Sequence, residues 1–213
     1  MSSPLTTIEM PERIAALPTN HAGYPVPWFV AWVDGKPDFR LMDEEKIHLA
    51  IIDRLCWICG DGLGRWQTYA VGPMCAVNRI SAEPPSHTEC AVYAAQVCPF
   101  LITPTKGRRE GRLPGETKDA AGFMLKRNPG VVLLWTTRSD PMPFRAPGGL
   151  LFTLPDPVSV LWFSEGRSAT RAEVIASIES GLPALLELDG DDPRAKAEVD
   201  RRYDEVKRTL LPA

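Results

Sequence analysis

Residues 56–60 and 86–90, which read CWICG and SHTEC, are the two stretches that decide the expected fold. The first has two cysteines separated by two residues, a spacing at which a tight turn presents both thiolates to one metal ion. The second has a histidine and a cysteine three positions apart, which share one face when they lie on a helix. Zinc binds four such donors in a tetrahedron. The candidate ligands of one Zn²⁺ ion are Cys56, Cys59, His87 and Cys90.

The order of these features is typical of a treble-clef zinc finger, in which a cysteine knuckle, a hairpin and a ligand pair at the start of a helix follow one another. The first turn of a helix favours a thiolate because its unpaired N–H groups and its dipole carry positive charge. Gly60 follows the knuckle, where a chain reversal can need a positive φ. Two more cysteines bear on the ligand set. Cys75 lies in an expected loop and is an alternative to His87 or Cys90. Cys98 would lie roughly 16 Å from His87 along an intact helix, so we assign it to core packing.

A catalytic zinc site is the alternative to a structural one. Four protein ligands close a structural site, whereas a catalytic site keeps one position open for water. His87 and Glu89 together with a C-x-x-C pair supply the residue types of a zinc deaminase. However, the deaminase pattern runs in the opposite order, Leu55 stands where its proline belongs, and Cys90 would fill the position of the water. The spacing therefore favours structural zinc, and we assign no catalytic residue.

The first half of the chain is expected to form short elements around this site. A helical turn is predicted over residues 11–17, and strands near 28–33 and 38–42 flank a tight-turn pair at residues 34–35. Asp43 is the predicted N-cap of a helix over residues 43–55. Residues 64–74 are interpreted as a short hairpin or strand and residues 75–85 as a loop. Ser86 is the predicted N-cap of a helix that ends before Pro99.

The second half of the chain shows strand patterns followed by helical ones. Strands are expected over residues 122–127, 131–138, 149–154 and 158–163. Thr170 and Glu173 have the spacing of a capping box at the start of a helix over residues 170–182. A last helix is expected over roughly residues 193–210.

Composition indicates a globular chain. Hydrophobic residues make up 44% and charged residues 24% of the 213 positions, which argues against disorder. The 21 prolines are about twice the usual share of ~5%, so short elements are expected. The N-terminus lacks the pattern of a signal peptide, and the longest apolar run, residues 131–135, is far shorter than the ~20 residues that span a bilayer. We therefore expect a cytoplasmic protein with no membrane partner.

A basic stretch within residues 106–127 is the candidate contact with nucleic acid. Its seven lysines and arginines against three acidic residues give a net charge of +4. Arg108, Arg109 and Arg112 are the candidate phosphate contacts. A solvated loop is the alternative interpretation, because the net charge of the whole chain is −3 and gives no general attraction to nucleic acid.

Five stretches of the chain carry a resemblance to known sequences. They are CWICG (56–60), GPMCAVNRISAEPPSHTEC (72–90), NPGVVLLW (128–135), FRAPGGLLF (144–152) and WFSEGRSATRAEVIASIESGLP (162–183). Through them the chain resembles a family of uncharacterised bacterial and bacteriophage proteins. The likeness covers most of residues 24–186, and the tail after Asp189 falls outside it. This family carries no assigned activity, so the resemblance implies a phage or mobile-element setting and no chemistry.

Together these features predict an α+β protein. A treble-clef-like zinc-binding unit is expected over residues 1–103, a basic linker or loop over 104–118, and a strand-rich unit with two terminal helices over 119–213; the two units are also compatible with one shared core. The expected function is a zinc-stabilised intracellular binding protein, with nucleic acid or another protein as its partner. The alternatives are an enzyme with a pocket between the units, of zinc-dependent hydrolase or deaminase type, and an accessory structural phage protein.

Overall fold

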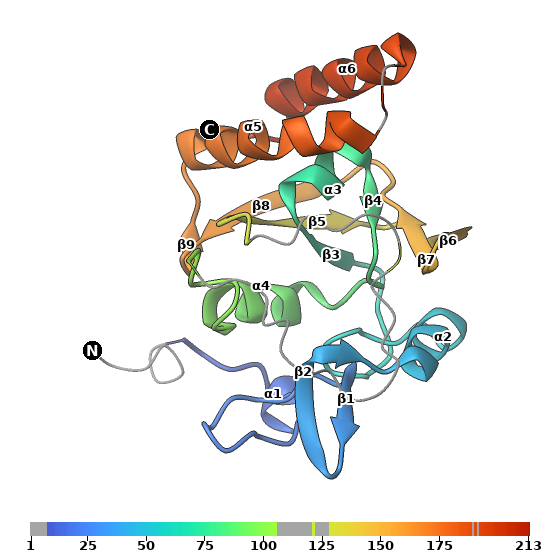
Figure 1. Ribbon diagram of the computed structural model, residues 1–213. Helices are drawn as coiled ribbons and strands as arrows, with labels where there is room; N and C mark the ends of the chain where they lie inside the picture. The colour runs from blue at the N-terminus through green and yellow to red at the C-terminus, as the bar shows by residue number, and fades with distance from the viewer. Residues whose placement is uncertain (1–7, 106–120, 122–127, 189, 191) are drawn as a thin grey trace.

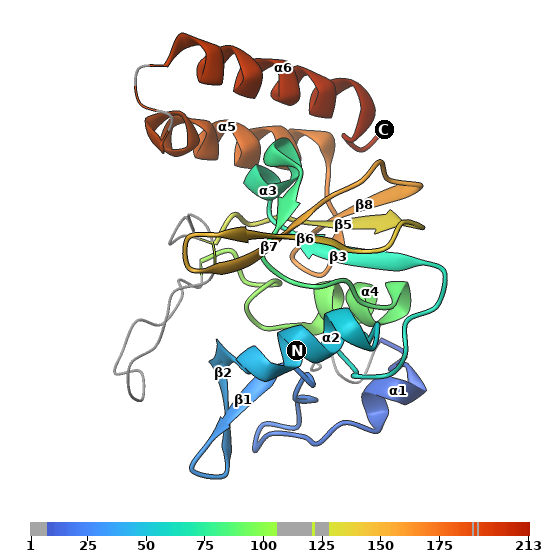
Figure 2. The same ribbon diagram turned by 90° about the vertical axis from the view of Figure 1, so that its right-hand side faces the viewer.

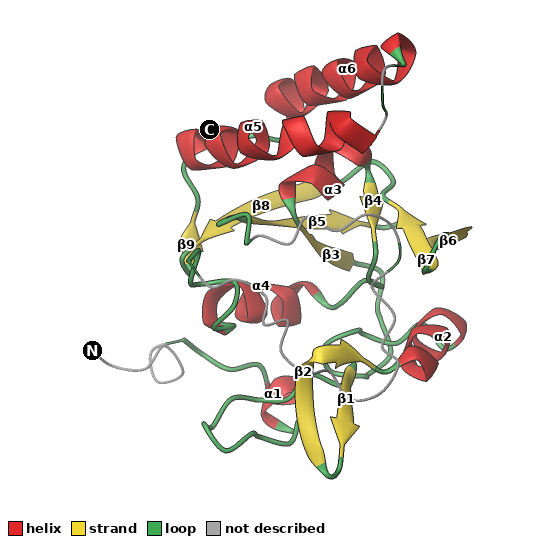
Figure 3. Ribbon diagram, viewed as in Figure 1, coloured by secondary structure: helices red, strands yellow, loops and turns green. Residues whose placement is uncertain are grey.

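The computed structural model describes residues 8–105, 121, 128–188, 190 and 192–213. Within these residues the protein is mixed α+β, its strands form three antiparallel sheets, and two helices lie at the C-terminal end (Figure 3). The elements are α1 (Glu12–Ala15), β1 (Val30–Val33), β2 (Lys36–Met42), α2 (Glu44–Ile52), β3 (Gln67–Val71), α3 (Pro73–Asn78), β4 (Ile80–Ser81), α4 (Thr88–Val97), β5 (Val132–Thr137), β6 (Met142–Ala146), β7 (Gly149–Thr153), β8 (Ser159–Ser164), β9 (Arg167–Ser168), α5 (Arg171–Leu188) and α6 (Pro193–Thr209).

The central sheet has the strand order β3-β5-β8-β9, and helices cover both of its faces (Figure 1). All six residues of β5 are buried. Because successive side chains of a strand point to opposite faces, Leu134 joins a cluster with Ala91 of α4, whereas Trp135 joins the larger core with Ile178 of α5. Figure 2 shows α3 between this sheet and the pair α5 and α6.

Two smaller sheets complete the fold. Strands β4, β7 and β6 form one, in which β7 lies in the middle. The other is the β1–β2 hairpin, which lies with α1 and α2 on the far side of α4 from the central sheet (Figure 1). Its turn residues Asp34 and Gly35 have φ values of +48° and +72°, as the predicted tight turn requires.

Local sequence signals correctly predicted most helix starts. The Asp43 side chain accepts a hydrogen bond from the Glu45 amide at the start of α2, as expected of an N-cap. At the start of α5 the Glu173 carboxylate accepts from the Thr170 amide at 2.7 Å, and the Glu173 amide donates to the Thr170 hydroxyl at 3.3 Å. The predicted capping box is therefore present.

Three expectations about helices are wrong. Residues 75–85 are not a loop throughout, because α3 occupies 73–78 and β4 follows it. Proline at the first helical position, Pro73, has a fixed φ suited to a helix start, and its missing N–H needs no partner there. Ser86 is not the N-cap of α4: its backbone pairs with that of Thr68 in extended conformation, so His87 is the N-cap. Helix α5 does not stop at residue 182 but continues through Pro183 to Leu188, where Leu185 packs against the core.

Some expectations lie outside the described residues, namely the strand over 122–127 and positions 106–118 of the linker. The division into two units stays a prediction. Strand β3 of the expected first unit pairs with β5 of the expected second unit, from Gln67 opposite Thr137 to Val71 opposite Leu133. Among the helices that the structure describes, none has the length and apolar character needed to cross a membrane.

Candidate metal centre

The structure brings the four predicted donors together. One ligand atom from each side chain, three sulfurs and an imidazole nitrogen, lies within 4.8 Å of the other three. Metal bonds of about 2.0–2.3 Å in a tetrahedron would separate such atoms by about 3.5–3.8 Å. His87 Nδ1 lies 3.4 Å from Cys59 Sγ and 3.9 Å from Cys90 Sγ, close to that range. The four residues therefore form a cluster that could hold a metal ion such as zinc.

Backbone hydrogen bonds shape the knuckle that carries Cys56 and Cys59. The Gly60 amide donates to the Cys56 carbonyl at 2.8 Å, and the Cys56 amide donates to the Asp61 carbonyl at 2.7 Å. Gly60 has φ of +83°, which is why glycine suits this position. The reversal turns both thiols inward, and Cys56 and Cys59 are 0% and 8% exposed.

The second ligand pair opens α4. His87 is its N-cap and Cys90 lies in its first turn. With Ser86 as the N-cap, both ligands were expected within the first turn, and this holds for Cys90 but not for His87. The His87 amide points at the knuckle and donates to Cys56 Sγ at 3.3 Å, as the Cys59 amide does at 3.5 Å. Backbone N–H groups aimed at a sulfur stabilise its thiolate.

The imidazole of His87 is oriented through both of its nitrogens. While Nδ1 faces the sulfurs, Nε2 lies 3.0 Å from the Gly62 carbonyl oxygen. A carbonyl can only accept, so the tautomer that satisfies this contact carries its proton on Nε2 and leaves Nδ1 a free lone pair for a metal. In that tautomer the nearby Arg13 Nη1, itself a donor, lies 3.1 Å from Nε2 without a hydrogen bond to it. Metal-binding histidines usually donate their second N–H in this way.

The three thiols influence one another's ionisation. Hydrogen bonds from the Cys59 and Cys90 thiols hold the pKa of Cys56 well below its usual range, although burial acts in the opposite direction. The same hydrogen bond to Cys56 raises the pKa of Cys59 to about 11, and hydrogen bonds with Cys56 and Cys59 raise the pKa of Cys90. Three thiolates at this spacing would repel one another unless a cation lay between them.

Arg13 is a residue of this site that the sequence did not indicate. Its Nε lies 2.8 Å from Glu89 Oε1, and its Nη1 lies 3.1 Å from His87 Nε2 and 3.9 Å from Asp61 Oδ2. The predicted helical turn at residues 11–17 gave no sign of this contact, because Arg13 and His87 are 74 positions apart. Only the tertiary fold places the Arg13 guanidinium beside the ligand cluster.

The remaining candidate residues lie elsewhere. Cys75 is on α3, where it packs against the main core, and Cys98 is the C-cap of α4; neither belongs to the four-residue cluster. This excludes Cys75 as a replacement ligand in this arrangement and leaves Cys98 outside the ligand set. Cys98 is half-buried and belongs to none of the three apolar clusters of the described residues, so its assignment to core packing stays a prediction. The candidate phosphate contacts Arg108, Arg109 and Arg112 lie outside the described residues.

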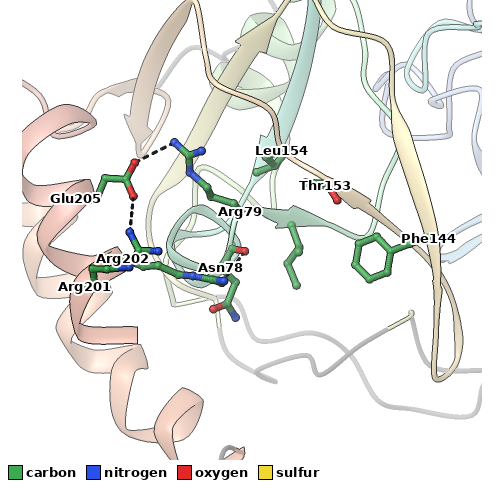
Figure 4. Close-up of a pocket in the computed structure, with 9 residues that line it drawn as sticks. Asn78, Arg79, Phe144, Thr153, Leu154, Arg201, Arg202 and Glu205 are labelled. Atoms are coloured by element: carbon green, nitrogen blue, oxygen red, sulfur yellow. Dashed lines mark hydrogen bonds and ion pairs between the residues drawn. The ribbon is translucent and has the colours of Figure 1, made fainter. Parts of the chain in front are cut away.

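A groove of about 570 Å³ between the end of α3, strand β7 and α6 is lined by three arginines (Figure 4). These arginines already have acceptors. Arg79 contacts Glu205 at 3.2 Å, Arg201 contacts Glu198 at 2.7 Å, and Arg202 donates to the Asn78 carbonyl at 3.2 Å. The contacts of Arg79 and Arg202 join α6 to the end of α3, whereas Arg201 pairs within α6. The arginines of this groove are therefore accounted for by helix packing and by a pair within one helix.

Comparisons with known proteins add no relative. No family model, no curated protein and no solved structure matches this chain. The resemblance to bacterial and bacteriophage proteins therefore stays a prediction.

Proposed function

We propose that Cys56, Cys59, His87 and Cys90 bind one structural zinc ion, and that the chain is a zinc-stabilised binding protein. The observation that carries this proposal is the convergence of all four ligand atoms within 4.8 Å of one another. Three sulfurs and one imidazole nitrogen are the donor set of a Cys₃His zinc site. Bound zinc would offset two of the three negative charges of neighbouring thiolates, which would otherwise repel one another.

The likeness to a treble clef is limited to the two ligand pairs. A cysteine knuckle and a pair at a helix start support it. The segment between them differs, since β3 pairs with β5, and α3 and β4 follow before the second ligand pair. We therefore propose treble-clef-like ligation in a protein whose connecting segment belongs to a larger sheet.

A structural role is favoured over catalysis for two reasons. Four protein donors leave no position for a reactive water at a tetrahedral ion. A deaminase-type mechanism would also need Glu89 as its acid and base, but this carboxylate is held by Arg13 Nε at 2.8 Å. In the part of the chain that the structure describes, no further residue arrangement supports the enzyme alternative.

The partner and the location are the less direct parts of the proposal. The basic stretch with Arg108, Arg109 and Arg112 supports nucleic acid as the partner because its net charge is +4. All five cysteines are free, and three of them are in the cluster. Such usage supports an intracellular, reducing location, where clustered cysteines bind metal more often than they form disulfides.

Metal analysis of the purified protein tests the zinc proposal. We expect one zinc ion per chain in the unmodified protein, and loss of that zinc in Cys56→Ser and Cys90→Ser. Cys98→Ser is the matched control, because Cys98 lies outside the cluster, and it should retain zinc. Absence of stoichiometric metal from the unmodified protein, both as purified and after reconstitution with zinc, would contradict the proposal.

A further inference from the structure

The N-terminal segment packs directly on the metal ligands. Ile14 of α1 is 2% exposed and lies in one cluster with Cys56, Cys59 and Cys90. Partly buried residues of the same segment, Ile8, Met10, Leu17 and Tyr24, surround that cluster. The cysteines thus form part of the surface against which residues 8–26 pack.

Backbone hydrogen bonds do not hold this segment to the rest of the described chain. Helix α1 has four residues, whereas isolated helices shorter than ~12–15 residues are marginal in water. Among the described residues, the backbone hydrogen bonds of residues 11–26 join positions within the segment itself, as in Ala15 to Pro11 and Val26 to Pro18. The first backbone bond to the rest of the chain is from the Trp28 amide to the Ile58 carbonyl. Side-chain contacts must therefore provide the docking.

Arg13 makes the polar part of those contacts. It precedes Ile14, and its guanidinium reaches Glu89 on α4, the His87 ring and Asp61 after the knuckle. Three thiolates, a neutral imidazole and a divalent cation sum to one negative charge, which a guanidinium at this position offsets. Arg13 therefore faces the metal centre and belongs to the segment at the same time.

From these contacts we infer that metal binding controls the docking of residues 8–26, with Arg13 as the positioning residue that couples the segment to the centre. This inference rests on the zinc site proposed above. The bound ion holds the three sulfurs and the His87 ring in fixed positions, so that they form a rigid packing surface for residues 8–26. Without it these four side chains lose their common partner, and among the described residues no backbone hydrogen bond joins residues 11–26 to the core.

Hydrogen exchange of the full chain, with zinc and after chelation, tests the inference. Amides of residues 14–17 should exchange at least about tenfold faster after chelation, whereas those of the central strand β5 should keep their protection. Unchanged exchange in a protein shown to have lost its zinc would overturn the inference while leaving the zinc site intact. A protein that never takes up zinc would overturn both.

A substitution outside the four ligands tests the inference even if chelation unfolds the whole chain, because the zinc ion stays bound. In zinc-loaded Arg13→Gln, residues 14–17 should exchange faster, and the apparent zinc affinity in competition with a chromogenic chelator should fall about tenfold, as for other outer-shell partners. The Co²⁺-substituted protein should keep the absorption of a Cys₃His site. Arg145→Gln on exposed β6 is the control and should change neither quantity. Arg13→Gln with wild-type affinity and exchange would overturn the inference.

Discussion

Gly60 lies directly against the indole ring of Trp28: a Cβ atom on Gly60 would stand 2.8 Å from ring atoms Cγ and Cδ1. Real Cβ contacts are essentially never that short. Trp28 belongs to the segment that leads into β1, and the backbone amide of Trp28 donates to the Ile58 carbonyl within the knuckle. The knuckle and this segment are therefore fitted to each other at the one residue without a side chain.

Gly60→Ala should destabilise the protein strongly. The residue has φ of +83°, and the added methyl group would have to displace the Trp28 ring. Strain and overpacking together predict a loss of about 2–4 kcal/mol in the free energy of unfolding, measured by urea denaturation of the zinc-loaded protein. Gly64→Ala is the control, since a Cβ there meets open space, and it should be neutral or slightly stabilising. Equal stability of the two variants would show that the close approach is not a constraint.

Tyr69→Phe should leave the protein as stable as before or make it more stable. Tyr69 is 0% exposed, and its hydroxyl has no hydrogen-bond partner in the described part of the chain. Removal of an unsatisfied buried hydroxyl is expected to change the free energy of unfolding by ~0 to +1 kcal/mol. Loss of more than ~1 kcal/mol would reveal a partner, such as a buried water.

Thr68→Val is the contrasting substitution on the neighbouring position of β3. The Thr68 hydroxyl contacts the Thr88 hydroxyl at 2.8 Å and the Thr136 hydroxyl at 2.9 Å. Valine keeps the shape of the side chain but removes the hydroxyl that both partners contact. We therefore expect the free energy of unfolding to fall by about 1–3 kcal/mol in the same urea measurement. Together the two variants separate the effect of a paired from an unpaired buried hydroxyl.

The capping box of α5 predicts a defined pH dependence. Hydrogen bonds from Arg167 and from the Thr170 amide and hydroxyl lower the pKa of Glu173 to about 2 from a usual value of 4.5. Because the folded-state pKa is the lower one, this stabilisation is complete above pH 4.5 and is lost as the pH falls towards 2.

Glu173→Gln measures that contribution by difference. The variant should unfold more easily than the unmodified protein at pH 7, and the two stability curves should converge between pH 4.5 and 2. Because the two proteins share the proposed zinc site, subtraction also cancels any effect of metal release in acid. A difference that stays constant down to pH 3 would mean that the carboxylate charge has no role in the cap.

Nucleic-acid binding, if the basic stretch provides it, should depend on salt. We expect that changing Arg108, Arg109 and Arg112 together to alanine lowers the slope of log K against log salt concentration by about 2–3, because each contact with duplex DNA contributes ~0.9. A fluorescence anisotropy titration at several salt concentrations measures this slope. Alanine at Arg194, Lys207 and Arg208 of α6 removes the same charge elsewhere and should leave it unchanged. Affinity of the unmodified protein that does not vary with salt would contradict phosphate contacts.

The sequence alone determined the features that depend on neighbours a few positions apart. The spacing of Cys56 and Cys59, the turn at residues 34–35, the N-cap Asp43 and the Thr170–Glu173 box are all such features, because turns and caps are closed by contacts over two to four residues. The same local information placed His87 and Cys90 near one helix start. Because zinc prefers four such donors, this local information was enough to predict that the two pairs bind the same ion.

The tertiary structure alone decided what requires contacts across the chain. It placed Arg13 beside His87 over 74 positions, and it paired β3 with β5 instead of folding residues 64–74 back on themselves. It also turned Ser86 away from its expected capping role by pairing it with Thr68. Each of these outcomes is set by which apolar faces are buried against one another, and burial is a property of the whole fold that no short stretch of sequence contains.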